Sequence, residues 1–545
     1  MSILIFLIVS YIVLSVALYF LFPEAGVNGV KGLIPGVNFM EWCELIGRPK
    51  WWAALLLIPI VNIFIYSGMA VDLVRSFGKY KFIHSFLAVV AGPIYFLSLA
   101  FDKDTKYVGK TIELEAAYSE RLGEALEKGN TRQIKKLQSQ NPYKKGPGRE
   151  WAEAIIFAVF AATFIRMFLI EAYVIPTPSM EGTLLVGDFL FVSKAHYGIR
   201  TPKTIAMLPL VHNRAPVVGG ESYLKKPSLE FKRLPALETI DRNDQVVFNY
   251  PEGDSVYVMP GRTWSIHDYR RGSIAMGIRQ HHRRIASGRE ELVTRPIDKR
   301  DHYIKRCVAV GGDSIQIIDR ELYINGTPAE EPQEVQYRYF VNYPASVQLN
   351  EDKLDDWGIE ANQKVADVQY DPQNRSRISN MILSDEQKEK VQSLDPNIKI
   401  EPVVYNSEID KPMQIFPHSP DNFQWTRDNF GPLWIPEEGA TIDLTERNMI
   451  LYERVIRDYE DNEVEKRGGQ IFINGEATTT YTFKQNYYWM MGDNRHNSED
   501  SRVWGFVPKD HIVGKPLFIW MSAKEGNLFK GIRFNRLFRG ADSPR

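Results

Sequence analysis

An uncharged apolar run near the N-terminus limits what this chain can fold into more than any other feature. Residues 3–22 contain no charged side chain. At a rise of about 1.5 Å per residue, a helix of this length covers the roughly 30 Å hydrocarbon core of a bilayer. The run has no basic segment before it and no small-x-small exit after it. It therefore predicts a retained transmembrane helix and not a cleaved leader.

Three further apolar runs follow along the chain, at residues 51–70, 82–101 and 151–175. The aromatic pair Trp51-Trp52 is typical of a membrane interface, although a buried helical hairpin of a soluble domain is the alternative for the first two of these runs. The last run carries Arg166 and Glu171 near its end. The pattern predicts a membrane domain of about three spans over 1–101 and a separate transmembrane anchor at 151–175.

The segment between the third and fourth runs sets the expected orientation. Residues 102–150 predict two short helices and hold eleven basic side chains: Lys103, Lys106, Lys110, Arg121, Lys128, Arg132, Lys135, Lys136, Lys144, Lys145 and Arg149. Basic segments beside spans stay in the cytoplasm, so everything after about residue 175 is expected on the extracytoplasmic, periplasmic side. Loop 71–81 would then lie outside despite three basic residues, and the longer basic linker decides the orientation.

Beyond residue 176 the pattern changes to short alternating runs separated by turns. The Asn-Gly pairs Asn325-Gly326 and Asn474-Gly475 are typical of tight β-hairpins. We therefore expect N-terminal transmembrane helices followed by a mainly β domain over 176–522. Two polar stretches fit this β core poorly and are interpreted as insertions, at 252–300 and 327–440.

The overall composition excludes several classes of function. The 66 Lys and Arg are balanced by 67 Asp and Glu, so no nucleic-acid partner is expected. Two cysteines without zinc-type spacing predict no disulfide framework, no metal and no cofactor. The tail, 523–545, interleaves basic and aromatic residues, which suits an anionic membrane surface. A solvated basic tail is the alternative.

Ser179 is the first residue with a chemical interpretation. It follows Pro176 and Pro178 and precedes Met180, in a turn close to the end of the last apolar run. A serine hydroxyl becomes a useful nucleophile only when a base takes its proton, and no histidine of the chain stands in a Gly-x-Ser-x-Gly context. An ordinary turn serine is the alternative.

Lys305 is a candidate for that base. Strand alternation places Tyr303, Lys305 and Cys307 on one face of the run 303–308. A lysine acts as a base near neutral pH only if burial destabilises its ammonium form. A solvated strand lysine is the alternative interpretation.

Two further segments suit acyl transfer. The backbone N–H of Ser179 and the hydroxyl of Thr177 are candidate donors to an oxyanion, because Pro178 has no N–H to offer. In the turn-rich segment 492–508, Ser498 is a candidate to orient the lysine amine. Asp500 and Arg502 are candidates to pair and to fix that loop.

Together these segments resemble bacterial type I signal peptidases, in the same order and nearly residue by residue. The resembling segments are 175–194, 301–313 and 492–508, with a weaker match at 241–248. The resemblance implies the β fold that signal peptidases share with self-cleaving repressors. The long form is similar to signal peptidases of Bacteroidetes. Three positions depart from the usual pattern: Gly182, Asn243 and His496.

The resemblance also implies roles and partners. Ser179 would be the nucleophile, Lys305 the general base and Thr177 an oxyanion donor, with Ser498 orienting the lysine and Asp500 and Arg502 structural. The implied enzyme is a serine endopeptidase that removes signal peptides after small-x-small sites at the outer face of the inner membrane. Pocket candidates, with core packing as the alternative, are Met180, Leu184, Tyr303 and Ile304.

The expected partners are signal-peptide-bearing precursors, the lipid bilayer and the secretion translocon. Two rival functions stay open at this stage. One is a Ser-Lys self-cleaving regulator, against which the spans and the lack of a DNA-binding module argue. The other is a catalytically silent membrane scaffold of the secretion machinery.

Overall fold

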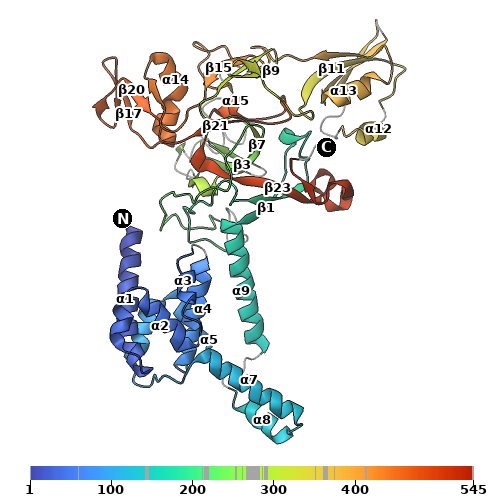
Figure 1. The fold of residues 1–545 in the computed structure, drawn as a ribbon. Helices are drawn as coiled ribbons and strands as arrows, with labels where there is room; N and C mark the ends of the chain where they lie inside the picture. Colours follow the sequence, from blue (N-terminus) through green and yellow to red (C-terminus); the bar gives the residue numbers. More distant parts are fainter. Residues whose placement is uncertain are drawn as a thin grey trace. The chain divides into compact units, whose positions relative to one another are not determined.

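The structure is a computed structural model of the whole chain, and it divides into two compact units, 1–156 and 157–545 (Figure 1). Each unit is described by itself. The described residues are 2–58, 61–141, 147–211, 213, 220–251, 255–259, 262–265, 283–284, 286–287, 293–349, 351–359, 366–373, 375–410 and 414–542.

The N-terminal unit is helical and has a core of its own. Its helices up to residue 100 are α1 (Ser2–Glu24), α2 (Val37–Ile46), α3 (Trp52–Leu55), α4 (Val61–Ser76), α5 (Phe82–Val90) and α6 (Gly92–Ala100). Trp42 and Cys43 from α2 pack against Met69 and Leu73 from α4, all fully or almost fully buried. Trp42 also donates its indole N–H to the carbonyl of Met69 at 3.2 Å.

The three spans expected over 1–101 are not confirmed. The run 51–70 is divided between α3 and α4, and the run 82–101 is interrupted at Ala91, whose backbone leaves the helical region (φ −134°) just before Gly92 and Pro93. Proline lacks the N–H that a continuing helix needs. Run 3–22 is continuous as α1, but among the described residues only one helix of the chain is long and apolar enough to cross a membrane, and it is α9 (Pro147–Phe168) over Glu150–Phe168.

The basic linker contains the two predicted helices, α7 (Thr111–Glu127) and α8 (Thr131–Ser139). Asn130 caps α8, since its side chain accepts a hydrogen bond from the backbone N–H of Gln133 at 3.1 Å. Thr131 is therefore the first helical residue.

The anchor expected over 151–175 is too long at its C-terminal end. Helix α9 stops at Phe168, and strand β1 (Ile170–Val174) begins two residues later. The cause is Glu171, whose carboxylate is buried in ion pairs with Arg166 at 2.8 Å and with Lys194 at 2.7 Å. A strand pairing with the chain around Lys194 brings these charges together, and a continued helix would not.

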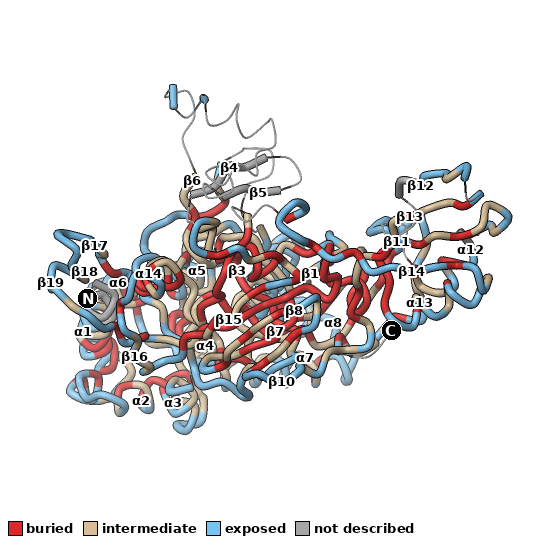
Figure 2. Tube along the Cα trace, turned by 90° about the horizontal axis from the view of Figure 1, so that it is seen from above, coloured by how far each residue is buried: buried red, intermediate tan, exposed pale blue. Residues whose placement is uncertain are grey.

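The C-terminal unit is built around an antiparallel sheet. Its strand order is β1, β2 (Asp188–Ser193), β23 (Ile512–Ser522), β3 (Gln245–Asn249), β7 (His302–Ala309), β21 (Tyr487–Met491) and β22 (Val507–Pro508). The short β24 (Arg539–Gly540) also pairs with β23. Figure 2 shows buried residues running through β3 and β7, where strands are covered on both faces. The mainly β character of this unit agrees with the prediction.

A second sheet shortens the predicted insertion 327–440. It has the order β10 (Thr327–Pro328), β9 (Glu321–Ile324), β8 (Ser314–Ile318) and β15 (Phe430–Trp434). Because β15 pairs with β8, and Phe430 and Leu433 lie in the main apolar core, residues around 430 belong to the domain and not to an insertion. Both Asn-Gly pairs form hairpin turns, with Asn325 and Asn474 at φ 53°.

The remaining part of that insertion is a small subdomain with its own core. Its sheet has the order β12 (Ala366–Asp371), β13 (Ser376–Leu383), β11 (Tyr337–Pro344) and β14 (Lys399–Pro402), with helices α12 (Glu351–Asp356) and α13 (Asp385–Gln392). The other predicted insertion, 252–300, lies largely outside the described residues. Its described strands are β4 (Ser255–Met259), β5 (Arg262–Ser265) and β6 (Val293–Thr294).

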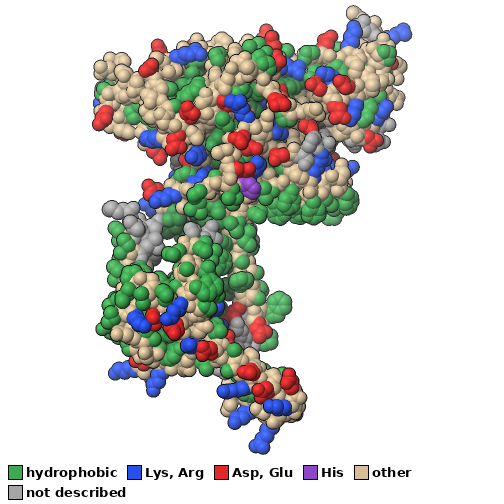
Figure 3. Space-filling model, viewed as in Figure 1, with side chains coloured by type: hydrophobic (Ala, Val, Ile, Leu, Met, Phe, Trp, Pro, Cys, Tyr) green, Lys and Arg blue, Asp and Glu red, His purple; other side chains and the backbone are tan. Residues whose placement is uncertain are grey.

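The C-terminal arm, residues 523–542, is a folded part of the β unit and not a free tail. Arg536 is buried, and its guanidinium pairs with Asp188 at 2.7 Å. Apolar side chains of the same arm face outward, and Figure 3 shows apolar side chains gathered on this part of the surface. The strongly exposed ones are Leu528, Phe529, Phe534 and Phe538.

Candidate active site

Ser179 lies in a short 3-10 turn, Pro178–Met180, directly after β1. Pro178 occupies the start of this turn, where its fixed φ is compatible with a helical residue. Two hydrogen bonds from Asn494 hold the turn: the Asn494 backbone N–H donates to Ser179 O at 3.2 Å, and its side-chain amide donates to Pro178 O at 3.2 Å. The segment 492–508 therefore contacts the serine turn directly.

Lys305 reaches the same place from the middle of the sheet. It lies in β7, opposite Val246 of β3, and is 3% exposed. Its Nζ forms a hydrogen bond with Ser179 Oγ at 2.7 Å and donates to the carbonyl of Ile304 at 2.9 Å. Sequence reasoning placed these two side chains on separate segments, and the structure brings them into contact.

Burial changes the proton affinity of Lys305. Loss of hydration lowers its pKa from 10.5 to about 8, although the carboxylates of Asp500, Glu499 and Asp493 favour the ammonium form. A pKa near 8 leaves a substantial neutral fraction close to neutral pH. The neutral amine can accept the proton of the Ser179 hydroxyl at the observed distance.

The loop after β21 carries the next three predicted residues. Asp500 and Arg502 are buried and paired, with Arg502 Nε donating to Asp500 Oδ1 at 2.9 Å. Asp500 also accepts a hydrogen bond from the backbone N–H of Gly492 at 3.1 Å. Ser498 lies in the same groove as Lys305, and its buried hydroxyl interacts with Asp500, where it helps to lower the pKa of that carboxyl. In this structure the Lys305 amine is therefore held by Ser179 Oγ and Ile304 O.

An open groove of about 770 Å³ surrounds the Ser179–Lys305 pair. Thr177, Met180, Tyr303 and Ile304 line it, as expected for oxyanion and pocket candidates. Leu184 does not line the groove and is fully buried in an apolar cluster that also contains Met180, Val192 and Val247. Leu184 is therefore a core residue, which was the alternative interpretation of the pocket candidates.

A buried ion pair close to the site was not predicted. Arg306, on the opposite face of β7 from Lys305, donates to both oxygens of Asp493 at 2.8 and 2.7 Å. Thr183 Oγ1 also donates to Asp493 at 2.6 Å. This contact joins the serine segment, the lysine strand and the loop 492–508. The sequence showed a charged residue in each of two segments, Arg306 and Asp493, and gave no indication that the two form a pair.

His496 makes a second unpredicted connection, from the same loop to the inserted region. Its Nε2 lies 2.8 Å from an oxygen of Asp428, its Nδ1 accepts the backbone N–H of Arg338 at 3.1 Å, and its ring stacks on Tyr405 at 4.2 Å. These contacts fit a neutral ring with the proton on Nε2, and burial lowers the pKa of His496 in agreement. Nothing in the local sequence relates residue 428 to residue 496.

We expect Asp428→Ala to destabilise the C-terminal unit by about 3 kcal/mol, because it leaves the His496 N–H and the backbone N–H of Tyr405 buried without an acceptor. Denaturant unfolding of the full chain measures this change. Asp421→Ala, at an exposed position, is the control and should change stability little. Equal stability of the two variants would contradict the assigned role of Asp428.

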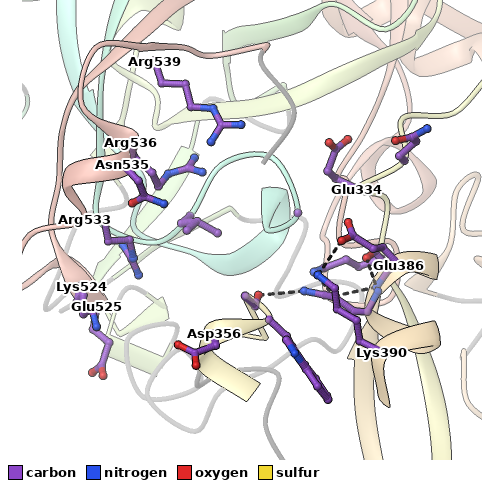
Figure 4. Close-up of a pocket in the computed structure, with 18 residues that line it drawn as sticks. Glu334, Asp356, Glu386, Lys390, Lys524, Glu525, Arg533, Asn535, Arg536 and Arg539 are labelled. Carbon is purple, nitrogen blue, oxygen red and sulfur yellow. Dashed lines mark hydrogen bonds and ion pairs between the residues drawn. The ribbon is translucent and has the colours of Figure 1, made fainter. Parts of the chain in front are cut away.

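A second cleft of about 440 Å³ lies elsewhere on the unit (Figure 4). Basic side chains of the C-terminal arm form one wall, including Arg533, Arg536 and Arg539, and α12 and α13 supply Asp356 and Glu386. Ser179 and Lys305 do not line this cleft. Its charged walls do not suit small apolar side chains, so the groove at Ser179 is the better candidate for an active site.

Comparison with known proteins decides the family. The model of the family described as "Signal peptidase, peptidase S26" matches residues 148–371 and 438–521, which make up more than half of the chain. This chain belongs to the signal peptidase family S26. The matched stretches contain Ser179, Lys305, Ser498, Asp500 and Arg502. It is a serine peptidase of the signal peptidase I type.

Curated relatives of this peptidase carry the name signal peptidase I. The protein from Haemophilus influenzae is 27% identical over 74% of this chain and 80% of its own length. That from Buchnera aphidicola subsp. Acyrthosiphon pisum is 27% identical over 70% of this chain and 79% of its own length. That from Aquifex aeolicus is 50% identical over only 48 residues, or 9% of this chain and 19% of its own.

Residues 1–147, 372–437 and 522–545 fall outside the main family match. Residues 30–110, in the helical unit, match a family of unknown function, DUF5684. Residues 372–437 are unmatched by the peptidase family, and they include Asp428 as well as Gln414 and Arg427, which line the groove. The groove of this peptidase therefore has a wall that the family match does not cover.

Proposed function

We propose that this peptidase cleaves signal peptides with Ser179 as the nucleophile and Lys305 as the general base. The observation that supports it most strongly is the 2.7 Å contact between Lys305 Nζ and Ser179 Oγ, in a groove where the lysine is almost completely buried. Burial makes the amine available as a base, and the contact gives it the serine proton.

The reaction follows from these positions. Neutral Lys305 takes the proton of Ser179 as the hydroxyl oxygen attacks the scissile carbonyl, and the oxyanion accepts hydrogen bonds from Ser179 N–H and Thr177 Oγ1. The lysine ammonium then protonates the leaving amine, which leaves an ester on Ser179. In the second half, neutral Lys305 takes a proton from water, and the hydroxide hydrolyses that ester.

We infer that the preferred sites have the pattern small-x-small. An extended substrate would lie along the groove and pair with exposed backbone beside it. Met180, Tyr303 and Ile304 line the groove that contains Ser179 and are proposed to form shallow pockets there. Ser498, held in the same groove by its loop, is proposed to orient the neutral amine when substrate excludes water, while Asp500 and Arg502 keep that loop in place.

Thr177→Val is expected to lower kcat by about 10²–10³-fold, because the isosteric valine removes one donor to the oxyanion. Thr177→Ser keeps the hydroxyl and should retain most of the activity. Initial rates with a synthetic precursor peptide measure both. A valine variant as fast as the serine variant would exclude Thr177 from the oxyanion site.

The pH dependence offers an independent test of the base. We expect kcat/KM to rise with pH and to level off above about 8, because the active form is the neutral amine and the pKa of Lys305 is about 8. Glu499 raises the pKa of Lys305, so Glu499→Gln should move the midpoint to lower pH, and the exposed-site control Asp421→Asn should not. A midpoint that stays near the ordinary lysine pKa would argue against Lys305 as the base.

We propose that α9 anchors this β unit to the inner membrane, with the unit on the periplasmic side. The basic linker before α9 supports that orientation, and the exposed aromatic side chains of the C-terminal arm support contact with the bilayer. A multi-pass N-terminal unit over 1–101 and contact with the translocon are part of the same proposal. The orientation is tested by placing single cysteines in segments 71–81 and 102–150 of the chain and labelling them in intact cells.

The direct test of the function is incubation of the detergent-solubilised full chain with a signal-bearing precursor. The expected result is a shortened product cut after a small-x-small site, with the peptidase itself unchanged in mass. No product from a folded chain would favour the scaffold alternative. A fragment of the chain itself would favour the self-cleaving regulator.

A further inference from the structure

A small, strongly charged pocket is lined by residues from the end of α9, from β1 and from the chain around Lys194 and Lys299. It encloses about 70 Å³ and is separate from the charged cleft of Figure 4. Two carboxylates, Glu171 and Asp298, line it. Five basic side chains line it as well: Arg166, Lys194, Arg200, Lys299 and His302. We call it the anchor-end pocket.

The two carboxylates of the anchor-end pocket differ in how far they are used, because Asp298 Oδ1 is buried without a hydrogen-bond partner among the described residues. Glu171 lies between Arg166 at 2.8 Å and Lys194 at 2.7 Å, and it accepts the Tyr173 hydroxyl at 2.7 Å. Asp298 accepts the backbone N–H and the hydroxyl of Thr204 at 2.9 and 2.8 Å.

The basic side chains also contact uncharged acceptor atoms, which hold them in place. Lys194 Nζ donates to Arg166 O at 2.8 Å, at the end of α9. Arg200 donates to Asn249 Oδ1 at 2.6 Å. Lys299 is 3% exposed, with Nζ 3.5 Å from Met207 Sδ. Positively charged hydrogen-bond donors that are buried and held in place are typical of a binding site and not of a solvated surface patch.

Charge among the lining residues does not balance. Four Lys and Arg against two carboxylates leave an excess of two positive charges, with His302 counted as neutral. The C-terminal end of the α9 dipole offsets about half a charge, and the carboxylate of Asp510, outside the lining, interacts with Arg200 and offsets a further part of the excess. Burial lowers the pKa values of Lys194, Arg200 and Lys299. An anion in the pocket would stabilise the charged forms of these side chains by Coulomb attraction and so oppose the effect of burial.

We propose that the anchor-end pocket binds one phosphate group, which a phospholipid headgroup or free phosphate can supply. At about 10–15 Å³ for each water-sized position, its volume accommodates about five non-hydrogen atoms, the size of a phosphate. Charge-assisted hydrogen bonds from lysine and arginine are the usual way to hold such a group.

The place of the pocket favours the lipid as the source, and this step rests on the proposal that α9 is the membrane anchor. The last turn of a transmembrane helix lies at the level of the headgroups. Thr163, Arg166 and Met167 from that turn line the pocket. His302 lines both this pocket and the groove at Ser179, so an occupied pocket would border the substrate.

The test is calorimetric titration of the full chain in a non-ionic detergent with three probes. They are dihexanoyl phosphatidylglycerol, inorganic phosphate, and dihexanoylglycerol, which has the same acyl chains and no phosphate. We expect saturable binding of the first and none of the last. Tight binding of the phospholipid alone identifies the lipid as the source, and equal binding of inorganic phosphate identifies free phosphate. No saturable binding of either phosphate probe overturns the proposal.

Substitutions locate the binding. Lys299→Gln is expected to weaken phosphate-probe binding at least about tenfold, the effect of losing one charged hydrogen bond, and Lys299→Arg should restore most of it. Lys509→Gln, a partly exposed lysine outside the pocket, is the matched control. Thermal unfolding verifies that each variant is folded. Unchanged affinity in folded Lys299→Gln would also overturn the proposal. Because binding is measured without cleavage, this result is independent of the Ser179–Lys305 mechanism.

Discussion

Replacing Lys305 by methionine is expected to lower precursor cleavage by about 10⁴-fold or more while the chain stays folded. The loss is large because the variant has no base at 2.7 Å from Ser179 Oγ. Methionine keeps the length and apolar packing of the side chain in a site that is 3% exposed. Cleavage rates of a precursor and thermal unfolding of the same preparation measure the two properties separately.

Burial of the Lys305 ammonium also affects the free energy of unfolding. The folded pKa of Lys305, about 8, lies below the ordinary lysine value of 10.5. The unfolded chain therefore binds more protons between these values, and the lysine costs stability below about pH 8. Lys305→Met should be at least as stable as the parent at pH 7, with Lys509→Met as the control that leaves cleavage unchanged. An active Lys305→Met variant would refute the proposed base.

The largest expected effect on stability comes from Asp500→Ala. Asp500 and Arg502 are both 1% exposed or less, so the variant leaves a guanidinium buried without its carboxylate and the Gly492 N–H without its acceptor. Breaking such a pair from one side costs about 3–5 kcal/mol. Urea unfolding of the full chain gives the free energy, and cleavage should fall as well, since this loop holds Ser498 beside Lys305.

The pair also predicts a pH window. Burial alone would raise the pKa of Asp500, but Arg502 outweighs burial and lowers it to about 2. The carboxylate therefore contributes its full stability above about pH 4, and the contribution is lost as the pH falls toward 2. A double variant, Asp500→Ala with Arg502→Met, should recover part of the loss. If the destabilisation of the double variant equals the sum of the effects of Asp500→Ala and Arg502→Met measured separately, the two residues do not act as a pair.

Sequence reasoning located the segments of the candidate site because these segments are short and follow strong local rules. Strand alternation placed Lys305 and Arg306 on opposite faces of β7, and their contacts with Ser179 and Asp493 lie on opposite faces. The proline-fixed turn at Ser179 is equally local. The pairing of Ser179 with Lys305, by contrast, depends on sheet order, and only the resemblance to a family suggested it from the sequence.

The errors fall where distant contacts decide the structure. Hydropathy extended the anchor to residue 175, but the ion pairs of Glu171 turn the chain into β1 after Phe168. The polar stretch 327–440 looked like one insertion, yet β15 pairs with β8. Arg536 was expected in a basic tail, either on a membrane surface or in solvent, and it is buried against Asp188. In each case the deciding contact joins residues more than twenty positions apart in the chain, which a local pattern cannot reveal.

The central claim is that Ser179 performs the attack on the scissile bond. Its most direct test is the rate at which purified full-length Ser179→Ala, verified as folded by thermal unfolding, cleaves a signal-bearing precursor, with Ser393→Ala at an exposed position as the control. The mechanism predicts no product above the uncatalysed background for Ser179→Ala and the parental rate for Ser393→Ala. Cleavage by Ser179→Ala at a rate within tenfold of the parent would contradict it.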